Sequence, residues 1–188
     1  ADRGDGGGRA VRESVLPGLA SYKRVSDYRL GQIAKLANVS FFPGSEMDRA
    51  SVLEFGADQV LIATGARWRP DGLGRATHAP VPGIAGHPQC LTPDDIMAGE
   101  FPGADSVLVY DDDHYYLGGV IAQLLADSGK TVTLVTPGPE VSCWTQNTME
   151  QHRIEKALLD RDVSLIVKHT LTGVESDSAS FACNTTDR

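Results

Sequence analysis

The sequence predicts an α/β fold organised around one strand–helix–strand unit, on the evidence of three consecutive segments. Residues 106–110 form a short apolar run rich in β-branched side chains, long enough for a buried strand. Residues 118–128 follow with apolar side chains at helical spacing, and Gly129 stands where a glycine ends a helix. Residues 131–136 are a second β-branched run. Because such crossovers are right-handed and join parallel strands, we expect both strands in one parallel sheet of a Rossmann-like lobe.

The turn between the first strand and the helix lacks the glycines that bind a dinucleotide. A pyrophosphate-binding turn reads G-x-G-x-x-G, because glycines allow a tight turn and close approach of the phosphates. Here the three glycine positions are occupied by Asp111, Asp113 and Tyr116. Carboxylates repel a pyrophosphate, and a tyrosine side chain replaces the glycine that lets helix and strand pack closely. The second strand ends at Thr136 and not at an acid that would bind ribose. We therefore expect a Rossmann-like unit that has lost its nucleotide.

Other readings of this turn and of the large aromatic residues favour structural roles. The three consecutive aspartates at 111–113 could hold a divalent cation, but consecutive side chains point in different directions, so we expect a solvated loop tip. Tyr115 or Tyr116 is expected to pack where a cofactor would otherwise lie. Trp68 and Trp144 could line a pocket, but packing in the core or between lobes is the favoured role. No catalytic triad or Cys–His pair can be proposed from spacing.

Composition limits the classes of function. The chain has 188 residues and a formal net charge of −8, without a cluster of basic residues, so nucleic acid and anionic membranes are poor partners. No apolar run reaches the roughly 18 residues of a membrane span. The 3 cysteines are far apart and lack C-x-x-C spacing, which argues for free thiols in a reducing cytoplasm and against a metal site in this chain.

The N-terminal part is predicted to begin in the middle of a fold. Residues 1–9 are glycine-rich and no strand precedes them, as expected for an excised fragment, although a flexible tail is an equal alternative. A helix is predicted over 25–36, a short strand over 39–42, and a helical turn capped by Asp48 or Ser51. Residues 59–65 read as an apolar strand that ends in Ala63, Thr64 and Gly65. Such a small-residue turn allows close approach of a nucleotide or of another backbone, and an ordinary turn is equally open.

The remaining segments complete the predicted organisation. Residues 66–90 are a Pro- and Gly-rich connection, followed by a short helix that begins after Thr92. Beyond the second strand we expect a helix from Asn147 or Thr148, a strand over 163–167 and a terminal hairpin. The residues expected on the inner face of that helix are Met149, Ile154, Ala157 and Leu158. The hairpin strands are residues 170–174 and 180–183.

Several of these motifs together resemble the trimethylamine/dimethylamine dehydrogenase family. This family is related to histamine dehydrogenase and 2,4-dienoyl-CoA reductase, which are of the NADH:flavin oxidoreductase type. The A-T-G segment is weak evidence by itself, but Ala-Thr-Gly-Ala-Arg-Trp with Leu-Pro-Gly-Leu upstream is more specific. The matching segments are residues 6–9, 12–14, 16–19, 27–29, 62–68, 82–83, 91–93 and the central strand–helix–strand unit.

The resemblance implies a parent flavoprotein oxidoreductase of which this chain is a C-terminal fragment. The parent would carry FMN and a 4Fe-4S cluster in a TIM barrel, and ADP or FAD in a domain like the FAD domain of glutathione reductase. Residues 1–78 would be part of that lobe, residues 79–104 a connection with a short helix, and residues 105–188 a lobe like the NAD(P) domain. Partners would be the rest of the parent chain and an electron-transfer flavoprotein.

The resemblance also assigns candidate site residues. Gly7, Gly8 and Arg9 match the segment that passes the diphosphate of the nucleotide, and the turn at 63–65 matches the one that approaches it. The turn at 111–116 departs from the NAD(P) pattern, which implies a structural or docking lobe with no catalysis by the fragment alone. Two alternatives are a stand-alone nucleotide-binding or protein-docking module, and an NAD(P)-dependent reductase lobe.

Overall fold

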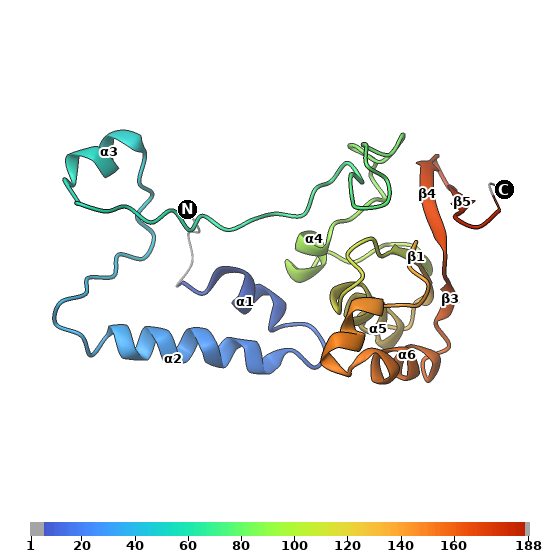
Figure 1. Ribbon diagram of the computed structural model, residues 1–188, viewed down its shortest axis with the longest axis horizontal. Coiled ribbons are helices and arrows are strands. Elements are labelled where there is room, and N and C mark those ends of the chain that lie inside the picture. Colours follow the sequence, from blue (N-terminus) through green and yellow to red (C-terminus); the bar gives the residue numbers. More distant parts are fainter. Residues whose placement is uncertain (1–5, 187–188) are drawn as a thin grey trace. The chain divides into compact units, whose positions relative to one another are not determined.

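The computed structural model describes residues 6–186 and divides the chain after Arg67 into two compact units (Figure 1). The first unit ends at Arg67 and the second begins at Trp68. Residues 1–5, which belong to the predicted glycine-rich tail, lie outside the described residues. The predicted segment boundaries at 78 and 104 remain predictions.

The second unit is built on a parallel three-stranded sheet in the order β1-β2-β3. Strand β1 (Ser106–Tyr110) pairs with β2 (Thr131–Val135) in parallel, with Ser106 opposite Thr131, and β2 pairs in parallel with β3 (Ser164–Ile166). Helix α5 (Leu117–Asp127) connects β1 to β2 and packs on both strands, and α6 (Gln151–Leu159) packs on α5. The structure therefore confirms a mixed α/β fold with the predicted parallel strand–helix–strand unit.

The core of this unit lies between β2 and the two helices. Leu125 of α5, Leu134 of β2 and Leu158 of α6 are fully buried. The predicted inner face of α6 is right for Ile154 and Leu158 but wrong for Met149, whose side chain is 92% exposed. The reason is that residues 143–148 form a separate 3-10 helix, η2 (Cys143–Thr148), and Met149 ends it in a left-handed conformation, so α6 begins later than predicted.

The Pro- and Gly-rich connection is packed against the rest of the second unit. It leads to α4 (Pro93–Met97), which begins at the predicted place because Thr92 and Asp95 form a reciprocal capping box. The predicted hairpin is present as β4 (His169–Val174) and β5 (Ala179–Cys183), paired antiparallel. The backbone N–H of Val174 donates to the carbonyl of Pro82 at 2.9 Å, which attaches the connection to β4.

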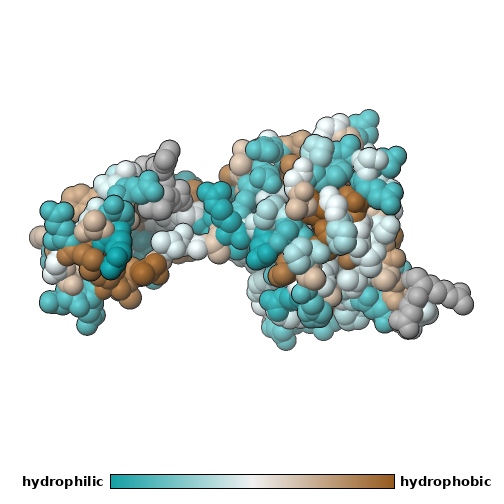
Figure 2. All heavy atoms as spheres, turned by 90° about the horizontal axis from the view of Figure 1, so that it is seen from above, coloured by the Kyte–Doolittle hydropathy of each residue, from teal (hydrophilic) through white to brown (hydrophobic). Residues whose placement is uncertain are grey.

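The first unit contains short helices and long irregular segments. Its elements are α1 (Gly8–Glu13), the 3-10 helix η1 (Ala20–Tyr22), α2 (Lys23–Ile33) and α3 (Arg49–Glu54). Helix α2 corresponds to the predicted helix. Asp48 is the cap of α3, because its carboxylate accepts from the backbone N–H of Ser51 at 2.8 Å. Figure 2 shows apolar side chains exposed on the surface, and the exposed ones of this unit include Phe42, Phe55 and Leu61.

Two predicted strands of the first unit are wrong. Residues 39–42 and 59–65 have no strand structure, and the side chains of Leu61 and Ile62 are 96% and 84% exposed. An apolar run becomes a strand only where a neighbouring strand accepts and donates its backbone hydrogen bonds. Among the described residues of this unit no strand is present to pair with either run.

Within the described part of the chain, no helix has the length and apolar character needed to cross a membrane.

Candidate functional site

The turn that follows β1 is closed by one of its own carboxylates. Asp111 is only 3% exposed, and its Oδ1 atom accepts from the backbone N–H groups of Asp113 and His114 at 3.1 and 3.2 Å. The backbone N–H of Asp111 donates to the carbonyl of Val135 at 2.8 Å and continues the pairing of β1 with β2. The prediction of a solvated loop tip is therefore wrong, because Asp111 turns inward to satisfy the amides of the turn that follows it.

The environment of Asp111 disfavours its charged form. Burial, and to a smaller degree the nearby carboxylates of Asp113 and Asp112, raise the pKa of Asp111 to about 6, against the opposing effect of the two backbone N–H groups. Its second oxygen, Oδ2, is buried and has no hydrogen-bond partner in the described structure. Gly118 in the first turn of α5 makes room for this side chain, because a Cβ atom there would lie 2.6 Å from Cγ of Asp111.

Asp112 attaches the turn to the Pro- and Gly-rich connection. Its two carboxylate oxygens accept from the backbone N–H of Ala76 at 3.1 and 3.0 Å. The connection approaches this carboxylate so closely that a Cβ atom on Gly74 would lie 2.1 Å from Oδ2 of Asp112. The segment around Gly74 to Thr77 is further held by the hydroxyl of Thr77, which accepts from the N–H of Gly74 and donates to the carbonyl of Gly72. A charged side chain and a local turn therefore fix this loop over the end of the sheet.

His114 links the same turn to the segment that follows β2. Its Nδ1 atom lies 3.3 Å from the hydroxyl of Thr136, and its Nε2 atom lies 3.6 Å from Oδ1 of Asp112. Burial lowers the pKa of His114, although the negative charge of Asp112 acts in the opposite direction. The carbonyl of His114 accepts from the backbone N–H of Trp144 at 2.9 Å, so the turn also positions η2.

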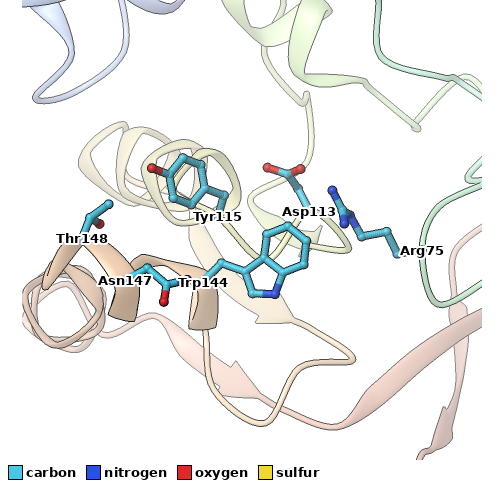
Figure 3. Close-up of a pocket in the computed structure, with 6 residues that line it drawn as sticks. All are labelled: Arg75, Asp113, Tyr115, Trp144, Asn147 and Thr148. Carbon is cyan, nitrogen blue, oxygen red and sulfur yellow. The ribbon is translucent and has the colours of Figure 1, made fainter.

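An open pocket of about 360 Å³ lies beside this turn (Figure 3). Its wall combines charged, aromatic and small polar side chains, which are Arg75, Asp113, Tyr115, Trp144, Asn147 and Thr148. The guanidinium carbon of Arg75 lies 4.1 Å from the ring centroid of Trp144. The ring of Tyr115 packs edge-on against Tyr116, with 4.9 Å between centroids. The pocket is therefore assembled from the connection, the turn after β1 and the 3-10 helix after β2.

Sequence reasoning missed most of this pocket. For Trp144 the sequence favours packing in the core or between lobes over a place in a pocket, but the side chain is 43% exposed and lines the pocket. Arg75 lies in a loop and Asn147 in a short 3-10 helix, and neither segment has a periodicity that indicates which side chains converge. The Pro–Gly content of the connection was the available signal, because a loop of this composition that stays ordered must be fixed by specific contacts.

The candidate cofactor residues of the first unit lie in two segments, which a hydrogen bond connects. Gly7 and Gly8 have positive φ angles at the start of α1, and Arg9 pairs with Glu13 along that helix. Residues 63–65 are an exposed irregular segment. A guanidinium nitrogen of Arg12 donates to the carbonyl of Ala66 at 3.5 Å, which connects α1 to the end of this segment.

The glycines of these two segments have different surroundings. A Cβ atom on Gly7 would lie 2.3 Å from the hydroxyl of Ser26, so helix packing alone explains this glycine. Gly8 and Gly65 each face open space. An added Cβ atom would therefore meet no obstacle at either position, and the assignment of residues 7–9 and 63–65 to a nucleotide diphosphate stays a prediction. No group of three or more metal-ligating side chains occurs among residues 6–186.

Comparisons with known proteins identify the family. Residues 91–181 match the family described as OYE-like second alpha/beta domain. Dimethylamine dehydrogenase from Hyphomicrobium sp. (strain x) is 33% identical over 136 residues, which cover 69% of this chain and 18% of that protein.

Solved structures agree with this assignment. Histamine dehydrogenase from Rhizobium sp. 4-9 is 42% identical, with a TM-score of 0.91. The match covers 96% of this chain and 28% of the histamine dehydrogenase chain. The 6-hydroxypseudooxynicotine amine oxidase from Pseudomonas geniculata N1 is 39% identical, with a TM-score of 0.92. The match covers 96% of this chain and 27% of the amine oxidase chain. A 2-naphthoyl-CoA reductase shares the fold at 20% identity and a TM-score of 0.75. This chain thus spans less than a third of the length of these relatives, and it belongs to the trimethylamine/dimethylamine dehydrogenase family of NADH:flavin oxidoreductase-type proteins, of which it represents one region.

Proposed function

We propose that the chain is a non-catalytic region of a larger flavoprotein oxidoreductase of the amine dehydrogenase type. The relatives that support this proposal are a dimethylamine dehydrogenase, a histamine dehydrogenase and an amine oxidase. In this proposal the parent carries FMN and a 4Fe-4S cluster outside this chain. The chain supplies part of an ADP- or FAD-binding lobe, and a Rossmann-like lobe that serves structure and docking.

The observation that carries the proposal is the position of the Asp111 carboxylate. In a dinucleotide-binding unit, the backbone N–H groups after the first strand are donors to the pyrophosphate. Here the N–H groups of Asp113 and His114 already donate to Oδ1 of Asp111, at 3.1 and 3.2 Å. An internal anion thus occupies the donors that a phosphate would need. We infer that the second unit holds its turn with its own side chain in place of a nicotinamide dinucleotide.

The exposed apolar run of the first unit supports a role within a larger chain. Leu61 and Ile62 are almost fully exposed, and free-standing domains seldom leave adjacent large aliphatic side chains in water. We propose that the rest of the parent chain covers this run. Residues 7–9 and 63–65 are then the part of the ADP or FAD site that this chain contributes. The net charge of −8 suits electrostatic docking of an electron-transfer flavoprotein.

An activity assay tests this function. The chain is incubated with FMN, FAD and ADP, and histamine- or dimethylamine-dependent reduction of an artificial dye is then recorded. We expect no amine-dependent reduction, because no residue assigned in this chain carries hydride or electrons. The full-length Rhizobium histamine dehydrogenase is the positive control. Reduction by the chain above the rate with FMN alone would contradict the proposed non-catalytic role.

A further inference from the structure

We propose that the pocket beside the β1 turn is a binding site for a small organic cation, and that Arg75 is its displaceable internal occupant. The pocket lies where β1 and β2 end, since Asp113 and Tyr115 follow β1 and Trp144 follows β2. Ligands of open α/β sheets bind outside the carboxyl ends of the strands. A volume of about 360 Å³ is within the range of small-molecule sites. This proposal does not depend on the proposed function of the parent protein.

The position of Arg75 indicates which chemistry the pocket accepts. Its guanidinium, a planar cation, lies 4.1 Å from the ring centroid of Trp144. Cations are attracted to the face of an indole by the ring quadrupole. Two contacts with His114 position the indole. The ring centroids of His114 and Trp144 lie 6.2 Å apart, and the backbone N–H of Trp144 donates to the carbonyl of His114. The structure therefore already contains a cation at a fixed aromatic surface.

The other side chains of the pocket also favour a cation. Figure 3 shows Asp113 on the same side of the pocket as Arg75, and Tyr115 across from Trp144. A carboxylate supplies the counter-charge, and the tyrosine ring provides a second aromatic surface. Asn147 and Thr148 lie at the other end, where a polar substituent of the ligand would be accommodated (Figure 3). Apart from Arg75, the lining carries no positive charge.

Arg75 can leave the pocket without disturbing the loop that carries it. The backbone of the loop is fixed by the bonds from Ala76 to Asp112 and by the hydroxyl of Thr77. The exposed side chain of Arg75 forms no hydrogen bond or ion pair with residues 6–186; its ring contact with Trp144 is the interaction that holds it. Such a contact at an exposed site is weak. A cation from solution can therefore replace the guanidinium on the indole face.

An anion site centred on Arg75 is the alternative, and the two assignments predict opposite effects of one substitution. If Arg75 competes with a cationic ligand, Arg75→Gln removes the competitor and strengthens binding. If Arg75 is the ligand-binding group for a carboxylate or phosphate, the same substitution weakens binding. The presence of Asp113 beside Arg75 opposes an anion, because its charge would repel the ligand.

Titration of the ¹⁵N-labelled chain tests the proposal through the indole N–H signals of its 2 tryptophans. Trp144→Phe assigns the Trp144 signal. Benzamidine is the cationic probe, benzamide is its neutral analogue of nearly equal shape, and benzoate is the anionic probe. We expect benzamidine to shift the Trp144 signal saturably in the millimolar range, and benzamide and benzoate to leave it unchanged. Arg75→Gln is expected to tighten benzamidine binding roughly two- to fivefold.

Matched variants complete the test. Asp113→Asn is expected to weaken benzamidine binding by about threefold or more, since it removes the counter-charge. Arg24→Gln, an exposed arginine on α2 outside the pocket, is expected to leave binding unchanged. Equal shifts with benzamide, weaker benzamidine binding in Arg75→Gln, or no saturable shift with millimolar benzamidine would each overturn the proposal.

Discussion

Replacing Gly118 by alanine is expected to destabilise the second unit by about 1–3 kcal/mol. A Cβ atom at this position would lie 2.6 Å from Cγ and 2.7 Å from Cβ of Asp111. Asp111 is buried and its carboxylate is hydrogen-bonded, so it cannot move aside freely. Where the added Cβ atom meets no obstacle, a glycine-to-alanine change inside a helix stabilises the protein by up to about 1 kcal/mol. A loss of stability in Gly118→Ala would therefore be opposite in sign to the effect of helix propensity. The measurement is urea unfolding followed by tryptophan fluorescence, because both tryptophans lie in the second unit.

Repeating the Gly118→Ala substitution in a variant that lacks the Asp111 side chain shows whether the overlap with Asp111 causes the loss of stability. In Asp111→Gly the obstructing side chain is absent, and the added effect of Gly118→Ala should fall to near zero or become stabilising. Gly31→Ala is the matched control, because Gly31 lies inside α2 and an added Cβ there meets no atom within 4 Å. It should raise helix stability, measured by circular dichroism. An equal loss for Gly118→Ala in both backgrounds would contradict the assigned contact.

Replacing Asp111 by asparagine is expected to stabilise the second unit at pH 7 by about 1–2 kcal/mol. Burial is the main cause that raises the pKa of Asp111 from 3.8 to about 6, so the charged form is disfavoured in the folded state by about 3 kcal/mol at pH 7. Asparagine keeps an oxygen that accepts from the two backbone N–H groups and removes the charge. Its amide group adds a buried donor, which offsets part of the gain.

The pH dependence of this effect has a defined sign. Because the pKa of Asp111 is higher in the folded than in the unfolded chain, the folded state binds more protons between about pH 4 and pH 6, and wild-type stability from this group rises as the pH falls. The advantage of Asp111→Asn should therefore shrink from pH 7 to pH 4. Urea midpoints at these two pH values measure it, with Asp177→Asn in the exposed turn between β4 and β5 as control. An advantage that is constant with pH would contradict a buried ionised Asp111.

The central unit was predictable because its signals are local. All of them lie within about thirty consecutive residues: the β-branched runs at 106–110 and 131–135, the apolar spacing of α5, and Gly129. The two runs pair with each other as β1 and β2, so neither needs a strand from elsewhere in the chain to be recognised. The capping box at Thr92 is equally local. The absence of glycines in the turn after β1 was also visible. However, the sequence could not show that Asp111 turns inward, because that depends on the space left by Gly118 and on two backbone N–H groups.

The remaining features depend on partners distant in the sequence. The runs at 39–42 and 59–65 have the composition of strands, but composition does not show whether a neighbouring strand exists, and none pairs with them in the described structure. The pocket depends on Arg75 reaching Trp144, which follows from the bond between Asp112 and Ala76. No periodicity in the sequence records a contact of this kind.

The central claim is that the Asp111 carboxylate occupies the backbone donors of the turn after β1. Its most direct test is calorimetric titration with NADH and NADPH of the wild-type chain and of the variant Asp111→Gly/Asp113→Gly/Tyr116→Gly. We expect no saturable binding to the wild-type chain, because the carboxylate of Asp111 occupies the N–H donors of Asp113 and His114. The variant, whose turn restores the glycine pattern, is expected to gain measurable affinity, provided that its circular dichroism spectrum shows the fold is retained. Saturable binding of NADH or NADPH to the wild-type chain would contradict the account and make this unit an electron-donor lobe.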